Sequence, residues 1–126
     1  AKILKVLQGV ELLAAKDMYP DELSGGMRRR VVIAIALLKE PKLLLCDEPF
    51  TGQDPLTKMH LLQLLDQLQK EYKFAMILVS HDVKETLELC PQTAVIMGGK
   101  LCALGAKQDL LAAPDERVVE FVERGL

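Results

Sequence analysis

The chain has 126 residues, of which 50% are hydrophobic, and its formal net charge is −2. That charge gives no electrostatic reason to bind nucleic acid, and an aromatic content of 4% argues against platforms for base stacking. No apolar run approaches the roughly 20 residues that a membrane-spanning helix requires, and no signal-peptide pattern opens the sequence, so we expect a cytoplasmic domain or a large piece of one.

The first 40 residues predict two helices separated by a break. Apolar residues recur at three- and four-residue spacing from Lys2 to about Ala15, which is typical of an amphipathic helix. Residues 19–22, which include Pro20, interrupt this pattern. Ser24 is a good N-cap, and no turn signal follows until residues 39–41, so a long helix is predicted from Gly25 to about Lys39.

Two short apolar runs predict strands, each followed by a helix. Residues 43–46 show no alternation, as expected of a strand covered on both faces in a parallel sheet, and residues 75–79 predict a second buried strand. Asp54 and Pro55 suit the start of a helix that runs to about Tyr72. Its inner face is predicted to carry Met59, Leu62, Leu65 and Leu68. Asp82 with Glu85 predicts a capping box for a helix that reaches about Leu89.

This order of elements predicts an α/β fold. Strands that alternate with helices imply right-handed crossovers and a mostly parallel sheet with flanking helices. Residues 93–97 and 101–104 flank Gly98, Gly99 and Lys100, which is the pattern of a C-terminal hairpin. Two short helices are predicted to begin near Lys107 and Asp115.

Three places along the chain carry residues suited to phosphate chemistry. Two glycines behind the capping Ser24 leave the first helix amides open to an anion, although such a sequence also occurs as a plain cap. Asp47 and Glu48 end a buried strand, where open α/β sheets bind ligands, whereas an isolated acidic pair is more often a solvated turn. His81 follows the second strand and is expected at the same edge, near Glu48, although an isolated histidine is usually structural.

Two other groups of charged or titratable residues are given ordinary structural roles. The arginine triplet Arg28–Arg30 is expected to form a solvated helix face. His60 lies inside the predicted helix without a partner pattern and is expected to be a structural residue.

The order of these motifs resembles that of the ATP-binding-cassette (ABC) ATPases over nearly the whole chain. The residues that carry the resemblance are Leu23-Ser24-Gly25-Gly26-Met27, the apolar run that ends in Asp47-Glu48-Pro49, the D-loop residue Asp54, and Ser80-His81-Asp82. The resemblance implies that Ser24, Gly25 and Gly26 contact the γ-phosphate of ATP, beside Met27 in place of the usual glutamine. It also implies that Asp47 binds Mg²⁺, that Glu48 is the general base, that Asp54 couples two sites and that His81 is the switch histidine.

No G-x-x-x-x-G-K-[ST] phosphate loop occurs in the sequence. By resemblance, the chain is expected to be the C-terminal part of a P-loop NTPase-type nucleotide-binding domain, inactive alone and an ATPase only as the complete subunit. Residues 1–40 would end the helical subdomain and carry the signature motif. Residues 41–106 would form a piece of the RecA-like core with Walker B, D-loop and switch histidine, and residues 107–126 the C-terminal helices.

Within this family the short sequence between Glu48 and Pro55 looks like that of transporter ATPases. The implied partners are a second nucleotide-binding subunit and transmembrane permease subunits at the inner face of the cell membrane, and no nucleic acid. The signature, residues 52–55 and residues 114–121 together resemble the ATPase subunit of bacterial phospholipid-trafficking transporters.

Two alternatives remain open. The first is the chromosome-maintenance and DNA-repair branch of the family, which would need a sustained heptad pattern before the signature that residues 2–20 do not offer. The second is a non-catalytic regulatory piece that supplies only its signature face to a complete subunit.

Overall fold

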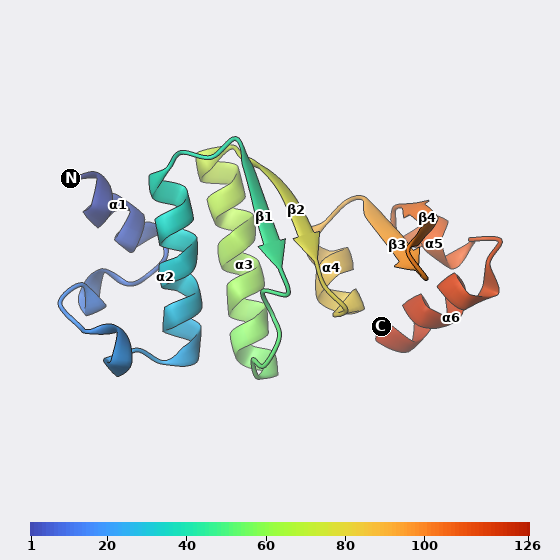
Figure 1. Cartoon of the computed structure of the whole chain (residues 1–126), viewed down its shortest axis with the longest axis horizontal. Helices are drawn as coiled ribbons and strands as arrows, with labels where there is room; N and C mark the ends of the chain where they lie inside the picture. The colour runs from blue at the N-terminus through green and yellow to red at the C-terminus, as the bar shows by residue number, and fades with distance from the viewer. The chain divides into compact units, whose positions relative to one another are not determined.

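Every residue from 1 to 126 is described in the computed structural model, in which residues 1–79 and residues 80–126 form separate units. The first unit contains α1 (Lys2–Gly9), α2 (Gly25–Leu38), β1 (Leu43–Asp47), α3 (Pro55–Tyr72) and β2 (Ala75–Val79), with short 3-10 helices at Leu13–Ala15 and Pro20–Glu22 (Figure 1). The second contains α4 (Val83–Leu89), β3 (Thr93–Met97), β4 (Lys100–Gly105), α5 (Lys107–Leu111) and α6 (Glu116–Gly125). None of these helices combines the length and the apolar character that crossing a bilayer requires. The division into residues 1–40, 41–106 and 107–126 stays a prediction.

The first unit is built on the parallel pair of β1 and β2. Leu43 lies opposite Ala75, and Asp47 lies opposite Val79. Parallel strands need a long crossover connection, which α3 supplies. In Figure 1, α2 and α3 run against the strands, so both helices begin at the end where the strands finish. The predicted α/β class and parallel pairing are confirmed.

The limits of α2 and α3 agree with the sequence because both helices have clear start signals. The Ser24 hydroxyl accepts a hydrogen bond from the Met27 amide at the start of α2. Asp54 caps α3, whose first residue is Pro55. Lys73, with φ of 54°, ends α3 in the left-handed conformation.

The predicted extent of the first helix is wrong, because α1 ends at Gly9 rather than near Ala15. Glu11 adopts a left-handed φ of 58° and donates its amide to the Gln8 carbonyl at 3.0 Å. The next amide, that of Leu12, reaches back to the Leu7 carbonyl at 2.8 Å, which completes a Schellman motif. Leu12 is buried beyond the turn, so the apolar pattern continues although the helix has ended.

The inner face predicted for α3 is correct for only part of its residues. Leu65 and Leu68 are buried, but Met59 is 52% exposed and Leu62 is only partly buried. A strict three-residue spacing drifts around a helix that turns by about 100° per residue, so Met59 and Leu68 lie on opposite sides. The buried stripe consists of Leu61, Leu64, Leu65 and Leu68.

The strands are covered on one face rather than on both, which corrects a second expectation. Leu44 is buried at 8% exposure, whereas its neighbours Leu43 and Leu45 are 48% and 68% exposed. In the paired register the exposed side of β2 carries Ile77 and Val79, which are 54% and 55% exposed. One apolar face of the pair therefore has no cover within the first unit.

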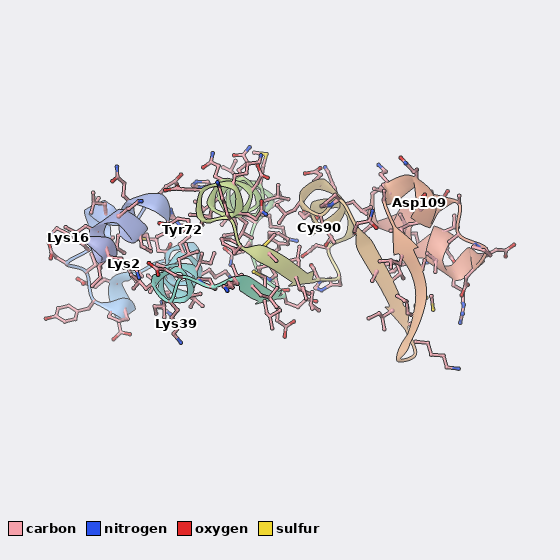
Figure 2. The ribbon with its side chains drawn as sticks, turned by 90° about the horizontal axis from the view of Figure 1, so that it is seen from above. Lys2, Lys16, Lys39, Tyr72, Cys90 and Asp109 are labelled. Carbon is pink, nitrogen blue, oxygen red and sulfur yellow. The ribbon has the colours of Figure 1, made fainter.

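Tyr72 closes α3 next to the end of α1 (Figure 2). A Cβ built on Gly9 would lie 3.6 Å from the Tyr72 hydroxyl, an ordinary contact distance, so the ring packs beside this end of α1. The hydroxyl is buried without a hydrogen-bond partner. Burial, and to a smaller extent the charge of Glu71, raises the pKa of Tyr72.

In the second unit, the predicted hairpin and C-terminal helices are confirmed. β3 and β4 pair antiparallel around Gly98 and Gly99, whose φ values of 56° and 73° fit a two-residue hairpin turn. The core of this unit is made by Val95, Leu110, Val118 and Val122.

The start of α4 differs from the expectation. The predicted capping box is wrong, because the Asp82 side chain makes no cap hydrogen bond. Its backbone is held instead, with the amide donating to Ser80 Oγ at 3.0 Å and the carbonyl accepting from Thr86 Oγ1 at 2.7 Å. α4 also approaches α6 so closely that a Cβ on Gly125 would lie 2.4 Å from Val83 Cβ, which requires glycine there.

The corrected face of α3 predicts how two truncations differ. Leu65→Ala should lower the free energy of unfolding by about 2–5 kcal/mol, because it leaves a cavity at a side chain that is 0% exposed. Met59→Ala, on the same helix, should change it by less than about 0.5 kcal/mol. Denaturant unfolding of the complete subunit measures both, and equal losses would contradict this assignment of the buried face.

Candidate functional site

The start of α2 leaves backbone amides open to a ligand. Ser24 Oγ accepts the Met27 amide at 3.2 Å, so the cap uses that donor. Gly25 and Gly26 occupy the first helical positions, where amides have no acceptor within the helix. A Cβ on Gly25 would meet nothing within 4 Å, so a ligand can approach the backbone there. The positive end of the helix dipole favours an anion at this place.

The start of α3 lies beside it and is ordered by Asp54. Asp54 Oδ1 accepts the amides of Leu56 and Thr57 at 3.1 and 3.0 Å, and Oδ2 accepts the Thr57 hydroxyl at 2.5 Å. These bonds, first of all that from the Thr57 hydroxyl, hold the pKa of Asp54 below its usual value. Asp54 is therefore a charged N-cap, as its position before Pro55 predicts.

A cavity of about 410 Å³ lies where the two helix starts meet. A Cβ on Gly26 would lie 3.4 Å from Thr57 Cγ2, which shows how close the starts of α2 and α3 are. Of the predicted site residues, the cavity brings together Ser24, Gly25, Gly26 and Asp54, and it does not include Met27, Asp47, Glu48 or His81. Its other lining residues are Arg30, Gly52, Gln53, Thr57, His60, Leu61 and Leu64.

Arg30 and His60 line the cavity, and both contact Glu11 beyond its wall. His60 Nε2 lies 2.7 Å from Glu11 Oε2, and Arg30 Nη1 lies 3.6 Å from the same oxygen. Glu11 occupies the left-handed turn that ends α1, so this cluster ties that turn to α2 and α3. His60 thus has the structural contact expected of it.

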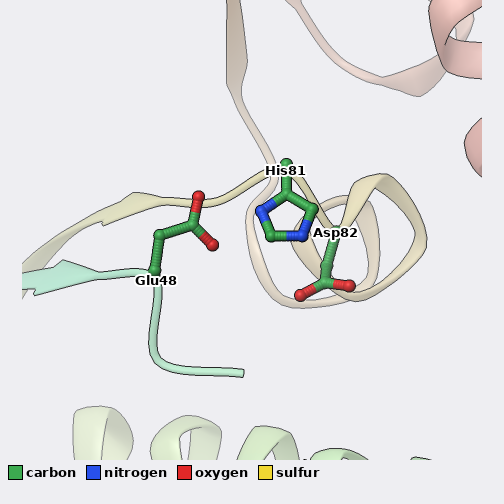
Figure 3. A group of neighbouring side chains, drawn as sticks. All are labelled: Glu48, His81 and Asp82. Carbon is green, nitrogen blue, oxygen red and sulfur yellow. The ribbon is translucent and has the colours of Figure 1, made fainter. Parts of the chain in front are cut away.

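The acidic pair lies at the end of β1. Asp47 is the last strand residue and is exposed, while Glu48 is half-buried with a left-handed φ of 48° (Figure 3). The Glu48 amide continues the strand pairing by donating to the Val79 carbonyl at 2.7 Å. Glu48 Oε2 accepts a hydrogen bond from Thr51 Oγ1 at 3.0 Å, so the loop itself orients the carboxylate.

The expectation that the arginine triplet forms a solvated face is wrong for two of its members. Arg28 is exposed, but Arg29 and Arg30 are partly buried. The Arg29 guanidinium donates to the carbonyls of Pro49 and Glu48 at 2.7 and 3.2 Å, and also to the Thr51 carbonyl. A hydrogen bond from a charged donor stabilises the folded state by about 1.5–3 kcal/mol. The left-handed conformation of an L-residue destabilises it by about 1–2 kcal/mol. These contacts are sufficient to hold Glu48 in its conformation.

The remaining predicted residue, His81, belongs to the second unit. It is exposed, follows β2 and precedes Asp82 at the start of α4 (Figure 3). The expectation that His81 acts with Glu48 joins residues of two units and stays a prediction.

Sequence reasoning missed three residues that shape these sites. Thr57 follows Asp54 by three residues, a spacing that could have indicated its hydroxyl contact with the cap. Thr51 is likewise three residues after Glu48. Arg29 contacts residues 19 to 22 positions away, and nothing in the local spacing indicates such contacts.

Comparison with known proteins agrees with these observations. The sequence profile of the family described as "ABC transporter" matches residues 1–51. The intermembrane phospholipid transport system ATP-binding protein MlaF of Haemophilus influenzae is 40% identical over 121 residues, which cover 96% of this chain and 46% of that protein. The methionine import ATP-binding protein MetN of Haemophilus ducreyi is 38% identical over 94% of this chain and 35% of its own length. The chain thus spans about half the length of the curated relatives it matches, or less.

Solved structures show the same relationship. The ADP conformation of MJ1267, an ATP-binding cassette of an ABC transporter, matches with a TM-score of 0.83 and 26% identity over 95% of this chain and 48% of its own. The structure of cbiO1 from Clostridium perfringens, part of the ABC transporter complex cbiONQ, matches with a TM-score of 0.83 and 30% identity over 99% of this chain and 49% of its own. Over nearly its whole length, the chain therefore matches part of the ATP-binding domain of ABC transporters.

Proposed function

We propose that this chain is part of an ATP-binding and ATP-hydrolysing subunit that powers an ABC transporter. The observation that carries the proposal is the cavity where Ser24, Gly25 and Gly26 of α2 meet Asp54 at the start of α3. Open amides, a helix dipole and a charged cap lie together there, at the end of the unit where β1 also finishes (Figure 1). A phosphate loop, which this sequence does not contain, would come from the rest of the subunit.

The open amides of Gly25 and Gly26 are proposed to bind the γ-phosphate of ATP presented by a second nucleotide-binding subunit. The geometry favours a contact through backbone donors, because a Cβ on Gly25 would have open space around it. Met27 replaces the usual glutamine, and its amide is engaged by the Ser24 hydroxyl, so its role there would be packing rather than phosphate binding. Asp54 would lie at the contact between the two subunits and couple their sites.

Asp47 and Glu48 are proposed to divide the chemistry of hydrolysis. A single exposed carboxylate such as that of Asp47 suits Mg²⁺, which commonly takes one or two carboxylates and keeps phosphate oxygens and waters as its other ligands. Glu48 would orient the attacking water and accept its proton, since phosphoryl transfer depends mainly on positioning. The Thr51 hydroxyl holds one oxygen of this carboxylate and so helps to fix its direction. His81 would contact the γ-phosphate.

We further propose that the transporter moves phospholipid, with the subunit bound to permease subunits at the cytoplasmic face of the membrane. The MlaF proteins of Haemophilus influenzae and Escherichia coli, named for intermembrane phospholipid transport, are each 40% identical to the chain. The MetN protein of Haemophilus ducreyi, named for methionine import, is 38% identical. The difference in identity is small, so the resemblance of the signature, D-loop and C-terminal residues to the phospholipid-trafficking type supports the choice as well.

Replacing the proposed base tests the enzymatic role. In the complete subunit, Glu48→Gln should leave ATP affinity within about twofold and lower the turnover number by about 100-fold or more, because an amide cannot accept the proton. Nucleotide titration and phosphate release measure the two effects.

The control for this substitution is Glu88→Gln, the same change at an exposed position of α4, which should leave both quantities unchanged. The 126-residue chain alone should hydrolyse no ATP, since it offers no phosphate loop. Hydrolysis that persists in the Glu48→Gln subunit would remove Glu48 as the base, and turnover by the chain alone would show that no further segment is needed.

The substrate class can be tested in vesicles that contain the complete transporter. We expect ATP-dependent transfer of a fluorescent phospholipid between vesicle populations, and its loss in the Glu48→Gln variant. Uptake of labelled methionine under the same conditions serves as the competing measurement. Methionine uptake without lipid transfer would contradict the proposed substrate while leaving the ATPase assignment intact.

A further inference from the structure

The loop between β1 and α3 is held by a single side chain from α2. Arg29 Nη1 donates to the Pro49 carbonyl at 2.7 Å and to the Glu48 carbonyl at 3.2 Å, and Nη2 donates to the Thr51 carbonyl. The planar guanidinium offers several donors in a fixed fork, which allows one residue to bind three carbonyls at once. All these residues lie in the first unit.

Glu48 is the residue whose backbone most needs this support. Its φ of 48° is a left-handed conformation that an L-residue keeps only when its surroundings determine it. The amide of Glu48 is fixed by the Val79 carbonyl at 2.7 Å, and its carbonyl is fixed by Arg29. The peptide groups on both sides of Glu48 are therefore held, one by β2 and the other by α2.

The same guanidinium also acts on the direction of the Glu48 carboxylate. Arg29 binds the carbonyl of Thr51, and the hydroxyl of Thr51 donates to Glu48 Oε2 at 3.0 Å. Loss of Arg29 would release the carbonyls of Glu48 and Thr51, the two residues that this hydrogen bond joins. A continuous series of contacts thus runs from α2 to the carboxylate.

We propose that Arg29 is a positioning residue for the hydrolytic reaction, which orients the Glu48 carboxylate through the loop of residues 48–51. Arg29 lies on the helix that begins with Gly25 and Gly26, so the helix that presents amides to phosphate also sets the direction of the general base. This inference rests on the proposed function, in which Glu48 acts on water. It assigns to Arg29 no contact with the nucleotide.

The direct test replaces Arg29 in the complete subunit. Arg29→Gln and Arg29→Lys should lower kcat by about 10- to 100-fold with little change in the KM for ATP. The glutamine amide has only two N–H donors, the lysine ammonium offers its three donors from one atom rather than from a planar fork, and a small misplacement of a catalytic group is costly. The matched control is Arg28→Gln, which should leave kcat unchanged, because Arg28 directly precedes Arg29 on the same helix and is exposed. A kcat within twofold of the unsubstituted subunit for a folded Arg29→Gln would overturn the proposal.

Thr51 provides a test that does not depend on the folding of Arg29 variants, because its side chain is exposed. Thr51→Val removes the hydroxyl and should lower kcat, whereas Thr51→Ser keeps the hydroxyl and should preserve it. In a double-mutant cycle, Arg29→Gln and Thr51→Val should be non-additive, with a combined loss close to the larger single loss. Full activity of Thr51→Val, or multiplicative losses in the double variant, would show that Arg29 does not act through this residue and would refute the proposed series.

Failure of this inference can be told apart from failure of the proposed function. If Glu48→Gln keeps its turnover, the assignment of the base is wrong and Arg29 has nothing to position. If Glu48→Gln is inactive while the variants of Arg29 and Thr51 keep full kcat, the base stands and only the positioning role is refuted. A loss that appears in the KM for ATP, with kcat unchanged, would mean that Arg29 acts on nucleotide binding instead.

Discussion

The parallel pairing of β1 with β2 constrains everything else in the first unit. Two parallel strands cannot be joined by a tight turn, so the chain must return along the sheet, and α3 makes that return. Because helices and strands then run in opposite directions, the open amides of α2, the cap of α3 and the acid at the end of β1 are placed at one end. The candidate site is therefore a consequence of strand order and direction, before any particular side chain is considered.

Within that frame, the seven residues between β1 and α3 are ordered mainly by polar contacts around one apolar anchor. Phe50 is 0% exposed and fixes the middle of the loop in the core, while Gln53 closes a turn onto its carbonyl at 3.2 Å. A partly buried cation needs partners to offset its lost hydration, and Arg29 finds them in backbone carbonyls. The loop gains order and the arginine gains partners through the same bonds.

Much of this architecture is readable from the sequence because its signals are local. Ser24 and Asp54 mark helix starts through hydrogen bonds with residues three positions away, and Gly98 with Gly99 marks a turn through left-handed φ values. The resemblance of the motifs to the ABC ATPases also predicted the family correctly. What sequence reasoning could not supply depends on residues far apart, such as the contacts of Arg29, or on a conformation that its residue type disfavours.

Two errors show this limit in physical terms. The apolar pattern extends past the end of α1 because Glu11, which is neither glycine nor asparagine, adopts the left-handed turn, and Leu12 then returns to the core in step with the helical spacing. For β1, a fully apolar run predicts that both faces of the strand are covered. Both faces are apolar, but only the face that carries Leu44 is buried within the first unit, and composition does not show which face has a packing partner.

The backbone conformation of Glu48 sets stability against the role proposed for its side chain. Glycine, or to a lesser degree asparagine, would relieve the left-handed conformation at this position. Sequence optimisation that rewards thermal resistance alone would therefore favour discarding the glutamate, and with it the proposed general base. Variation at residue 48 among natural or designed homologues would thus report whether durability or the proposed catalytic role has governed selection.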